Sequence, residues 1–189
     1  MKLWHLATLL GLAMAVPQIY GLLKPGAFAD ALRKFPRSEA WGLILMPLGT
    51  VWFLWNLKTD DIADFAAFKP IMFIGFAVVG FGACVFVRDF LAVRGWAVVV
   101  LLLAKFTLDT ARCVDTSWRL VIVVWAYLWI VLALWFTISP WRMRDLIGFL
   151  TASEQRIRMG SAARLAFGLL VLLLGLTAIR HSELQAAIP

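Results

Sequence analysis

Charged residues are scarce in this sequence. Asp, Glu, Lys and Arg together make up 15% of its 189 residues, whereas soluble domains carry about a quarter. Apolar residues make up 63%, and the mean hydropathy is +0.89. This composition argues against a soluble globular domain and excludes an intrinsically disordered chain. The sequence therefore predicts a protein that lies mostly within a lipid bilayer.

Six runs of residues are long and apolar enough to cross a bilayer, which takes about 20 residues as a helix. The predicted spans are residues 3–23, 40–57, 70–87, 90–108, 120–141 and 161–179. The fourth contains Arg94 and Lys105, and the sixth is short, so we expect Arg164 to extend toward the headgroups. We predict an all-α, polytopic transmembrane helical bundle that forms a single integral membrane domain over residues 1–189. Five spans are the alternative.

Lysine and arginine are unevenly distributed between the two sides of this arrangement. With the N-terminus outside, eleven of these residues fall on the inner side and seven on the outer side. Cytoplasmic loops of membrane proteins carry an excess of Lys and Arg. We therefore expect a multi-pass protein of the bacterial cytoplasmic membrane with both termini outside.

Two inner connections are predicted to form amphipathic helices. Apolar residues recur at the i, i+3, i+4, i+7 spacing of one helix face in 28–35 and again in 143–150. Basic residues lie off these faces, which is typical of a helix on the membrane surface; solvated loops are the alternative. Thr151 and Glu154 fit a capping box at the start of the last span. The basic residues assigned to anionic lipid headgroups are Arg33, Lys34, Arg37, Arg142, Arg144, Arg156 and Arg158.

Small residues recur on one face of the first and of the last span. Ala7, Gly11 and Ala15 are four positions apart, and Gly168 and Gly175 are seven apart. Small residues allow membrane helices to approach closely. We expect these five residues to form helix-packing surfaces, either inside the bundle or against another chain.

Lys105 and Asp109 form a possible intramembrane polar site. They are four residues apart, which places them on one helix face, and Arg112 continues that face. Ionisable residues within a membrane usually pair or face a cavity. The site is thus either an ion pair at the outer interface or the polar lining of a small transporter or channel.

Other polar groups indicate no chemistry. Asp60, Asp61 and Asp64 resemble the diphosphate–magnesium motif of prenyl-transferring enzymes, but a second acidic cluster is missing, so a solvated acidic loop is expected. His5 and His181 are predicted near outer span ends, where a shared metal or haem is geometrically conceivable, but interfacial amphipathic positions are the ordinary explanation. We expect no catalytic residue, no metal and no cofactor.

The segment 134–180 resembles the small two-helix inner-membrane proteins of the YjeT type. The match lies in a proline–arginine turn after an apolar helix, a basic segment, and a glycine-containing leucine helix. Its residues are Pro140, Arg142, Arg156, Gly160, Gly168 and Gly175. The chain departs from that pattern in the spacing around Gly160 and in its four additional upstream spans. The resemblance implies a basic linker on the inner side and implies no activity.

The sequence thus favours a non-enzymatic accessory or scaffolding subunit. Its expected partners are the lipid bilayer with its anionic headgroups and other membrane subunits or further copies of the chain, because it offers small-residue ridges and few deep polar groups. The excess of positive charge lies between apolar runs, so no nucleic acid is expected. A transporter or channel with its polar site at Lys105 and Asp109 is the alternative function.

Overall fold

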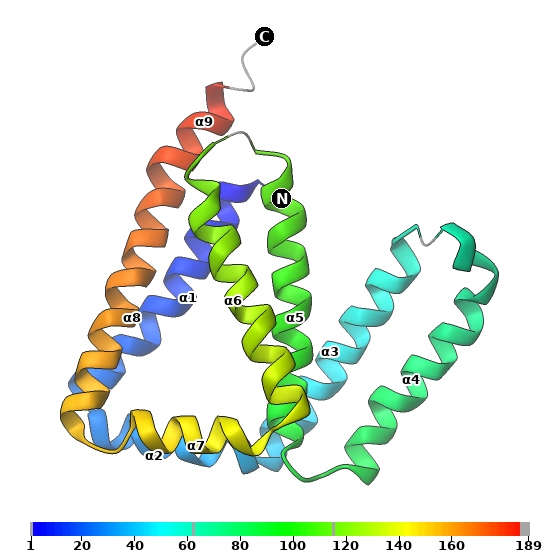
Figure 1. The fold of residues 1–189 in the computed structure, drawn as a ribbon, viewed down its shortest axis with the longest axis horizontal. Coiled ribbons are helices and arrows are strands. Elements are labelled where there is room, and N and C mark those ends of the chain that lie inside the picture. Colours follow the sequence, from blue (N-terminus) through cyan, green and yellow to red (C-terminus); the bar gives the residue numbers. More distant parts are fainter. Residues whose placement is uncertain (1, 62, 115, 186–189) are drawn as a thin grey trace. The chain divides into compact units, whose positions relative to one another are not determined.

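The structure is a computed structural model that describes residues 2–61, 63–114 and 116–185; these ranges are largely helical and contain no strand (Figure 1). The helices are α1 Leu3–Leu23, α2 Pro25–Lys34, α3 Glu39–Thr59, α4 Lys69–Phe86, α5 Leu91–Arg112, α6 Arg119–Ile138, α7 Trp141–Leu150, α8 Glu154–Leu174 and α9 Arg180–Gln185. The 3-10 turns η1 Phe35–Arg37 and η2 Ala63–Phe68 precede α3 and α4. A π-helical turn, η3 Gly175–Ile179, joins α8 to α9. The predicted all-α class is confirmed.

Six helical stretches of the described residues are long and apolar enough to cross a membrane. They are Leu3–Leu23, Glu39–Thr59, Phe65–Phe86, Leu91–Arg112, Arg119–Ile138 and Glu154–Gln185. Each contains or overlaps one of the six predicted spans. Six helices of this kind indicate a multi-pass membrane protein.

The predicted fifth span, 120–141, is too long at its C-terminal end. Helix α6 ends at Ile138, and α7 begins at Trp141. Pro140 lies between them, and a proline disfavours the helical conformation of the residue before it. The chain therefore leaves the span before the predicted boundary and turns into α7.

The start of the last span also differs from the prediction. Helix α8 begins at Glu154, and the hydroxyl of Ser153 accepts the backbone N–H of Arg156. The Thr151 hydroxyl instead donates to the Ile147 carbonyl. The predicted capping box of Thr151 and Glu154 is wrong, because Ser153 lies closer to the helix start and supplies the N-cap oxygen.

The described residues form two compact units. Unit 1 takes the described parts of 1–33, 104–129 and 145–189, and unit 2 takes those of 34–103 and 130–144. Helices α5, α6 and α7 each contribute one part to each unit. The prediction of one membrane domain over 1–189 stays a prediction, and each unit is described separately below.

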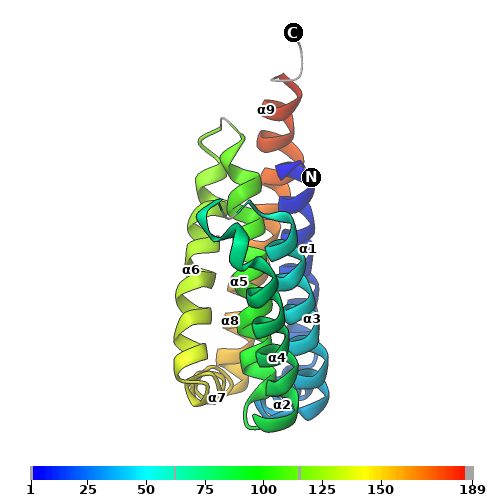
Figure 2. The same cartoon turned by 90° about the vertical axis from the view of Figure 1, so that its right-hand side faces the viewer.

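In unit 1, α1 and α8 run side by side in opposite directions (Figures 1 and 2). A Cβ atom at Gly11 would lie 2.7 Å from the Leu172 nitrogen, and one at Gly168 would lie 3.0 Å from the Ala15 nitrogen. One at Gly175 would lie 3.0 Å from the Cβ of Ala7. The five small residues singled out in the sequence thus meet between the two helices of one chain. Their lack of bulk allows backbone-to-backbone contact.

At one end of this pair, α2 lies across α1 and α8 rather than along them (Figure 1). Phe28 and Ala29 of α2 are buried together with Ile157 of α8, and Leu32 packs against them. The predicted apolar face of 28–35 therefore faces protein in part, through Phe28 and Leu32. Both connections predicted to be amphipathic are helical, as α2 and α7, and their position at a membrane surface stays a prediction.

Glycines also bring helices together in unit 2. A Cβ atom at Gly42 would lie 2.9 Å from the Leu91 Cβ, and one at Gly95 would lie 2.7 Å from the Met46 nitrogen. Helix α4 contacts α3 where Gly80 faces the Thr50 side chain. Helix α3 thus contacts both α4 and α5 at glycines, where the absence of a side chain allows the close approach.

We predict that Gly168→Leu destabilises unit 1. The new side chain would be inserted at backbone contact distance from α1, and overpacking of this kind costs about 1–3 kcal/mol. The thermal midpoint of the purified protein in mild detergent should fall. Gly148→Leu is the matched control, because a Cβ atom there meets nothing within 4 Å. Equal midpoints for the two variants would show that the α1–α8 contact does not carry the stability.

Candidate functional site

A polar layer interrupts the apolar contact between α1 and α8. Gln18 is 9% exposed, Ser161 is fully buried, and Arg164 follows Ser161 by one helical turn. Gln18 Oε1, Ser161 Oγ and Arg164 Nε have no hydrogen-bond partner among the residues that the structure describes. The Arg164 guanidinium lies beside Gly160, toward the start of α8. The amide oxygen of Gln18 can accept a hydrogen bond, the Ser161 hydroxyl can donate or accept one, and Arg164 Nε can donate one. The three groups of this helix pair therefore have complementary hydrogen-bonding capacities.

Lys105 and Asp109 pair with each other on α5. The Lys105 Nζ lies 3.0 Å from Asp109 Oδ2, and the two side chains are 44% and 50% exposed. Arg112, the last residue of α5, is also exposed. The two opposite charges therefore compensate each other on the helix surface. The transporter alternative, in which they line a cavity, stays a prediction.

Three exposed basic residues assigned to lipid headgroups also contact protein groups, and their assignment to headgroups stays a prediction. The Arg37 guanidinium lies 5.8 Å from the centre of the Phe90 ring. The Arg156 guanidinium lies 4.7 Å from the centre of the Phe149 ring, and Arg158 is 4.0 Å from a carboxylate oxygen of Glu154. Three others have exposed side chains: Lys34, Arg142 and Arg144.

Arg33 has the most specific of these contacts. Its Nε donates to the Thr151 hydroxyl at 2.9 Å, and its Nη2 donates to the Thr151 carbonyl at 2.6 Å. Thr151 follows the last residue of α7 and is 4% exposed. A cation at a helix C-terminus satisfies carbonyls that have no partner within the helix. Arg33 thus fastens α2 to the turn between α7 and α8.

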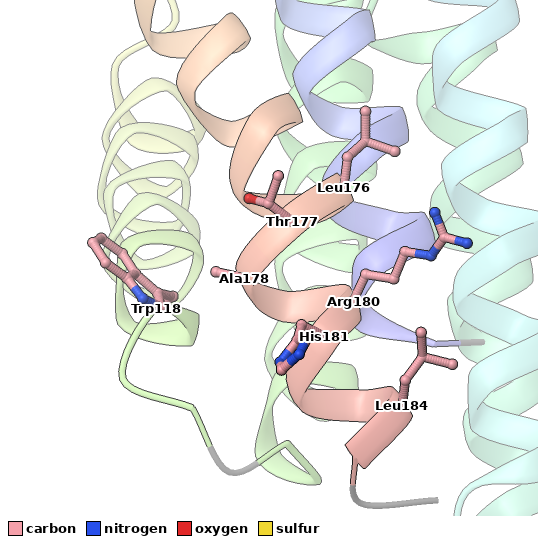
Figure 3. Close-up of a pocket in the computed structure, with 7 residues that line it drawn as sticks. All are labelled: Trp118, Leu176, Thr177, Ala178, Arg180, His181 and Leu184. Carbon is pink, nitrogen blue, oxygen red and sulfur yellow. The ribbon is translucent and has the colours of Figure 1, made fainter.

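A groove lies at the α9 end of unit 1 (Figure 3). We call it the α9 groove; it has a volume of about 600 Å³. Its lining comprises Trp118, Leu176, Thr177, Ala178, Arg180, His181 and Leu184. In Figure 3, Trp118 lies across from Ala178 and Thr177, whereas Arg180 lies at the opposite edge. The groove thus combines apolar side chains with an arginine and a histidine.

Local backbone features position these side chains. Arg119 donates to the Val114 carbonyl at 2.7 Å, which holds the start of α6, next to Trp118, against the end of α5. The π-helical turn η3 supplies three lining residues, and π-helical turns in helices frequently occur at functional sites. Because such a turn adds one residue, it rotates everything that follows by about 100° relative to an uninterrupted α-helix. The turn therefore decides the direction in which Arg180 and His181 point.

The remaining polar candidates do not come together as a site. No group of three or more His, Cys, Asp or Glu residues that could hold a metal occurs within the described part of the chain. The side chain of Asp64 lies outside the described residues. His5 stacks on Trp4 at a ring distance of 3.5 Å, and His181 lines the α9 groove. Cys84 and Cys113 are free thiols.

Sequence reasoning missed the α9 groove and the polar layer. Trp118, Arg180 and His181 are all assigned to the outer side by the span order, which was a signal that they could lie near one another. No feature of the sequence marks the π-helical turn. Gln18 lies three residues after Ala15, on the small-residue face of the first span, and this spacing was the available signal for the polar layer.

Comparison with known proteins identifies no relative: no protein-family model, no curated protein and no solved structure matches this chain. The functional argument therefore depends on the chain's own residues.

We predict that Arg33→Ala lowers the free energy of unfolding by about 1–2 kcal/mol. The substitution removes two hydrogen bonds from a charged donor and leaves the Thr151 carbonyl without them. Thermal unfolding in mild detergent measures the loss. Lys34→Ala, which removes the neighbouring exposed cation, should change the midpoint little. If both substitutions had the same effect, Arg33 would contribute only its charge.

Proposed function

We propose that this multi-pass membrane protein is a non-enzymatic accessory or scaffolding subunit. In this role it packs the open face of α4 against helices of another membrane protein chain. The proposal depends on one observation: α4 is far less covered by its own chain than the other five candidate spans.

The difference in coverage is large. Only 6% of the most apolar stretch around α4 is buried, against 22–44% in the other five candidate spans. Gly80, which faces Thr50 of α3, is the one buried residue of α4. The rest of the helix presents large apolar side chains, among them Val78 and Val79, which are 66% and 67% exposed. Helix α4 therefore has one side on α3 and most of its surface available.

Two glycines lie on the available side. A Cβ atom at Gly75 meets nothing within 4 Å, and one at Gly82 meets only Phe86, at 3.9 Å. Residues seven apart in a helix differ by about 20° in direction, so Gly75 and Gly82 share one face. Lipid tails are as apolar as leucine, so membrane helices associate through close packing at small residues. This face is suited to a second helix.

The alternative of a small transporter or channel depends on Lys105 and Asp109. Their mutual ion pair on the surface of α5 gives it no additional support. The resemblance of 134–180 to YjeT-type proteins stays a prediction, and it names no activity.

We expect the double variant Gly75→Leu, Gly82→Leu to lose its membrane protein partners. Leucines on that face would keep a neighbouring helix at a distance. The measurement is the set of proteins, including further copies of the chain, that remains bound after mild detergent extraction. Val85→Phe is the matched control: it adds bulk at an exposed position of α4, about 80° from Gly75 and about 60° from Gly82 around the helix. A wild-type chain that purifies alone and monodisperse would contradict the proposal.

We also propose the orientation with both termini outside, which the inner excess of Lys and Arg supports. In this orientation Cys113, an exposed thiol after α5, faces the outside. In a Cys84→Ser background, a membrane-impermeant maleimide should label Cys113 in intact cells. A Gly148→Cys variant that lacks both native cysteines should be labelled only after the membrane is opened. The reverse pattern would place both termini inside.

A further inference from the structure

We propose that the α9 groove binds one anionic phospholipid. Its phosphate lies at Arg180 and His181, and an acyl chain follows Leu176 toward the membrane interior. The groove belongs entirely to unit 1, and the inference does not depend on the partner proposed for α4.

The order of side chains along the helix matches the order of polarity in a phospholipid. Leu176 and Ala178 lie on the side of α8, the long apolar helix, and Arg180 and His181 follow at the start of α9. A phospholipid at the end of a span has the same order, with acyl chains toward the bilayer centre and phosphate toward water. Tryptophans prefer the boundary between these regions, and Trp118 lies across the groove, half exposed (Figure 3).

The charge of the lining favours an anion. Arg180 and His181 provide hydrogen-bond donors, and the lining residues that the structure describes include no carboxylate. The nearby carboxylate of Glu183 is directed to the start of α1, where Oε1 accepts the Leu3 N–H at 2.8 Å. A carboxylate is favourable at a helix N-terminus. The Arg180 guanidinium lies 5.3 Å from the centre of the Trp4 ring, which orients it at the groove edge.

The size of the groove separates a lipid from a free anion. Its volume of about 600 Å³ falls in the range of ligand pockets, roughly 300–1,000 Å³. Inorganic phosphate would leave most of it unfilled. Three apolar lining residues are substantially exposed: Trp118, Leu176 and Leu184 at 53%, 42% and 48%. An acyl chain covers such surface, and a free phosphate does not.

The test uses the full chain purified in a mild non-ionic detergent. Phosphatidylglycerol or phosphatidylcholine is titrated in, and bound lipid is counted by native mass spectrometry. We expect one phosphatidylglycerol to bind about tenfold more tightly than phosphatidylcholine, because its headgroup has a net negative charge, whereas the choline cation of phosphatidylcholine offsets the charge of its phosphate. Arg180→Gln combined with His181→Gln should lower the affinity for phosphatidylglycerol to that for phosphatidylcholine.

Two further variants keep the result interpretable if the double variant unfolds. Ala178→Phe fills the groove without altering Arg180 or Trp4, and it should remove the tight site. Arg112→Gln removes one positive charge outside the groove lining and should leave the site unchanged. Circular dichroism verifies the helical content of each variant.

Four results would overturn the inference. They are equal affinity for the two lipids, full binding by the Ala178→Phe variant, an equal loss in the Arg112→Gln variant, and displacement of the lipid by inorganic phosphate. The last result would assign the groove to a free anion.

Discussion

The close approach of α1 and α8 is the contact on which unit 1 depends. These helices lie at opposite ends of the chain, and they touch through backbone atoms where Gly11, Gly168 and Gly175 have no side chain. This contact brings Trp4 next to Arg180 and places α2 against the start of α8. Both the fastening by Arg33 and the α9 groove are consequences of that pairing, because each lies at one end of it.

The helices of unit 2 also approach one another at glycines, but α4 keeps most of its surface exposed. Gly42 and Gly95 bring α3 and α5 together, and Gly80 brings α4 to α3. A bilayer gives no hydrophobic drive for apolar helices to associate with one another, so shape decides which helices touch. Helix α4 carries glycines on two sides, and its own chain covers only one of them. This difference is the physical basis of the proposed scaffolding role.

Polar residues within the spans have local partners or lie at the ends. Lys105 and Asp109 compensate each other on α5, and hydroxyls such as those of Thr50 and Thr137 donate to carbonyls of their own helices. Among the described residues, Gln18, Ser161 and Arg164 of the α1–α8 pair and Arg94 of α5 are exceptions, since each has a buried polar atom without a hydrogen-bond partner. The α9 groove, in contrast, lies where a span ends and charged side chains are least costly.

Much of the fold could be predicted from the sequence. Long apolar runs located all six candidate spans, and four of these runs contain no charged residue, because burying an ionised group in hydrocarbon is costly. The spacing of Ala7, Gly11 and Ala15 identified a packing face, but it could not specify whether the facing helix belonged to the same chain. Prediction failed where neighbouring residues competed for one role, as Ser153 and Thr151 did for the cap of α8.

The sequence by itself determined the all-α class, the number of candidate spans and the residues suited to close packing. These follow from hydropathy, length and side-chain size, which are local properties. Tertiary structure alone decided that α1 faces α8, that Arg33 binds Thr151, and that a π-helical turn directs Arg180 and His181. The first two outcomes depend on contacts between residues more than 100 positions apart. The third depends on the rotation that the π-helical turn adds to the helix. The spacing of residues within a single segment specifies neither.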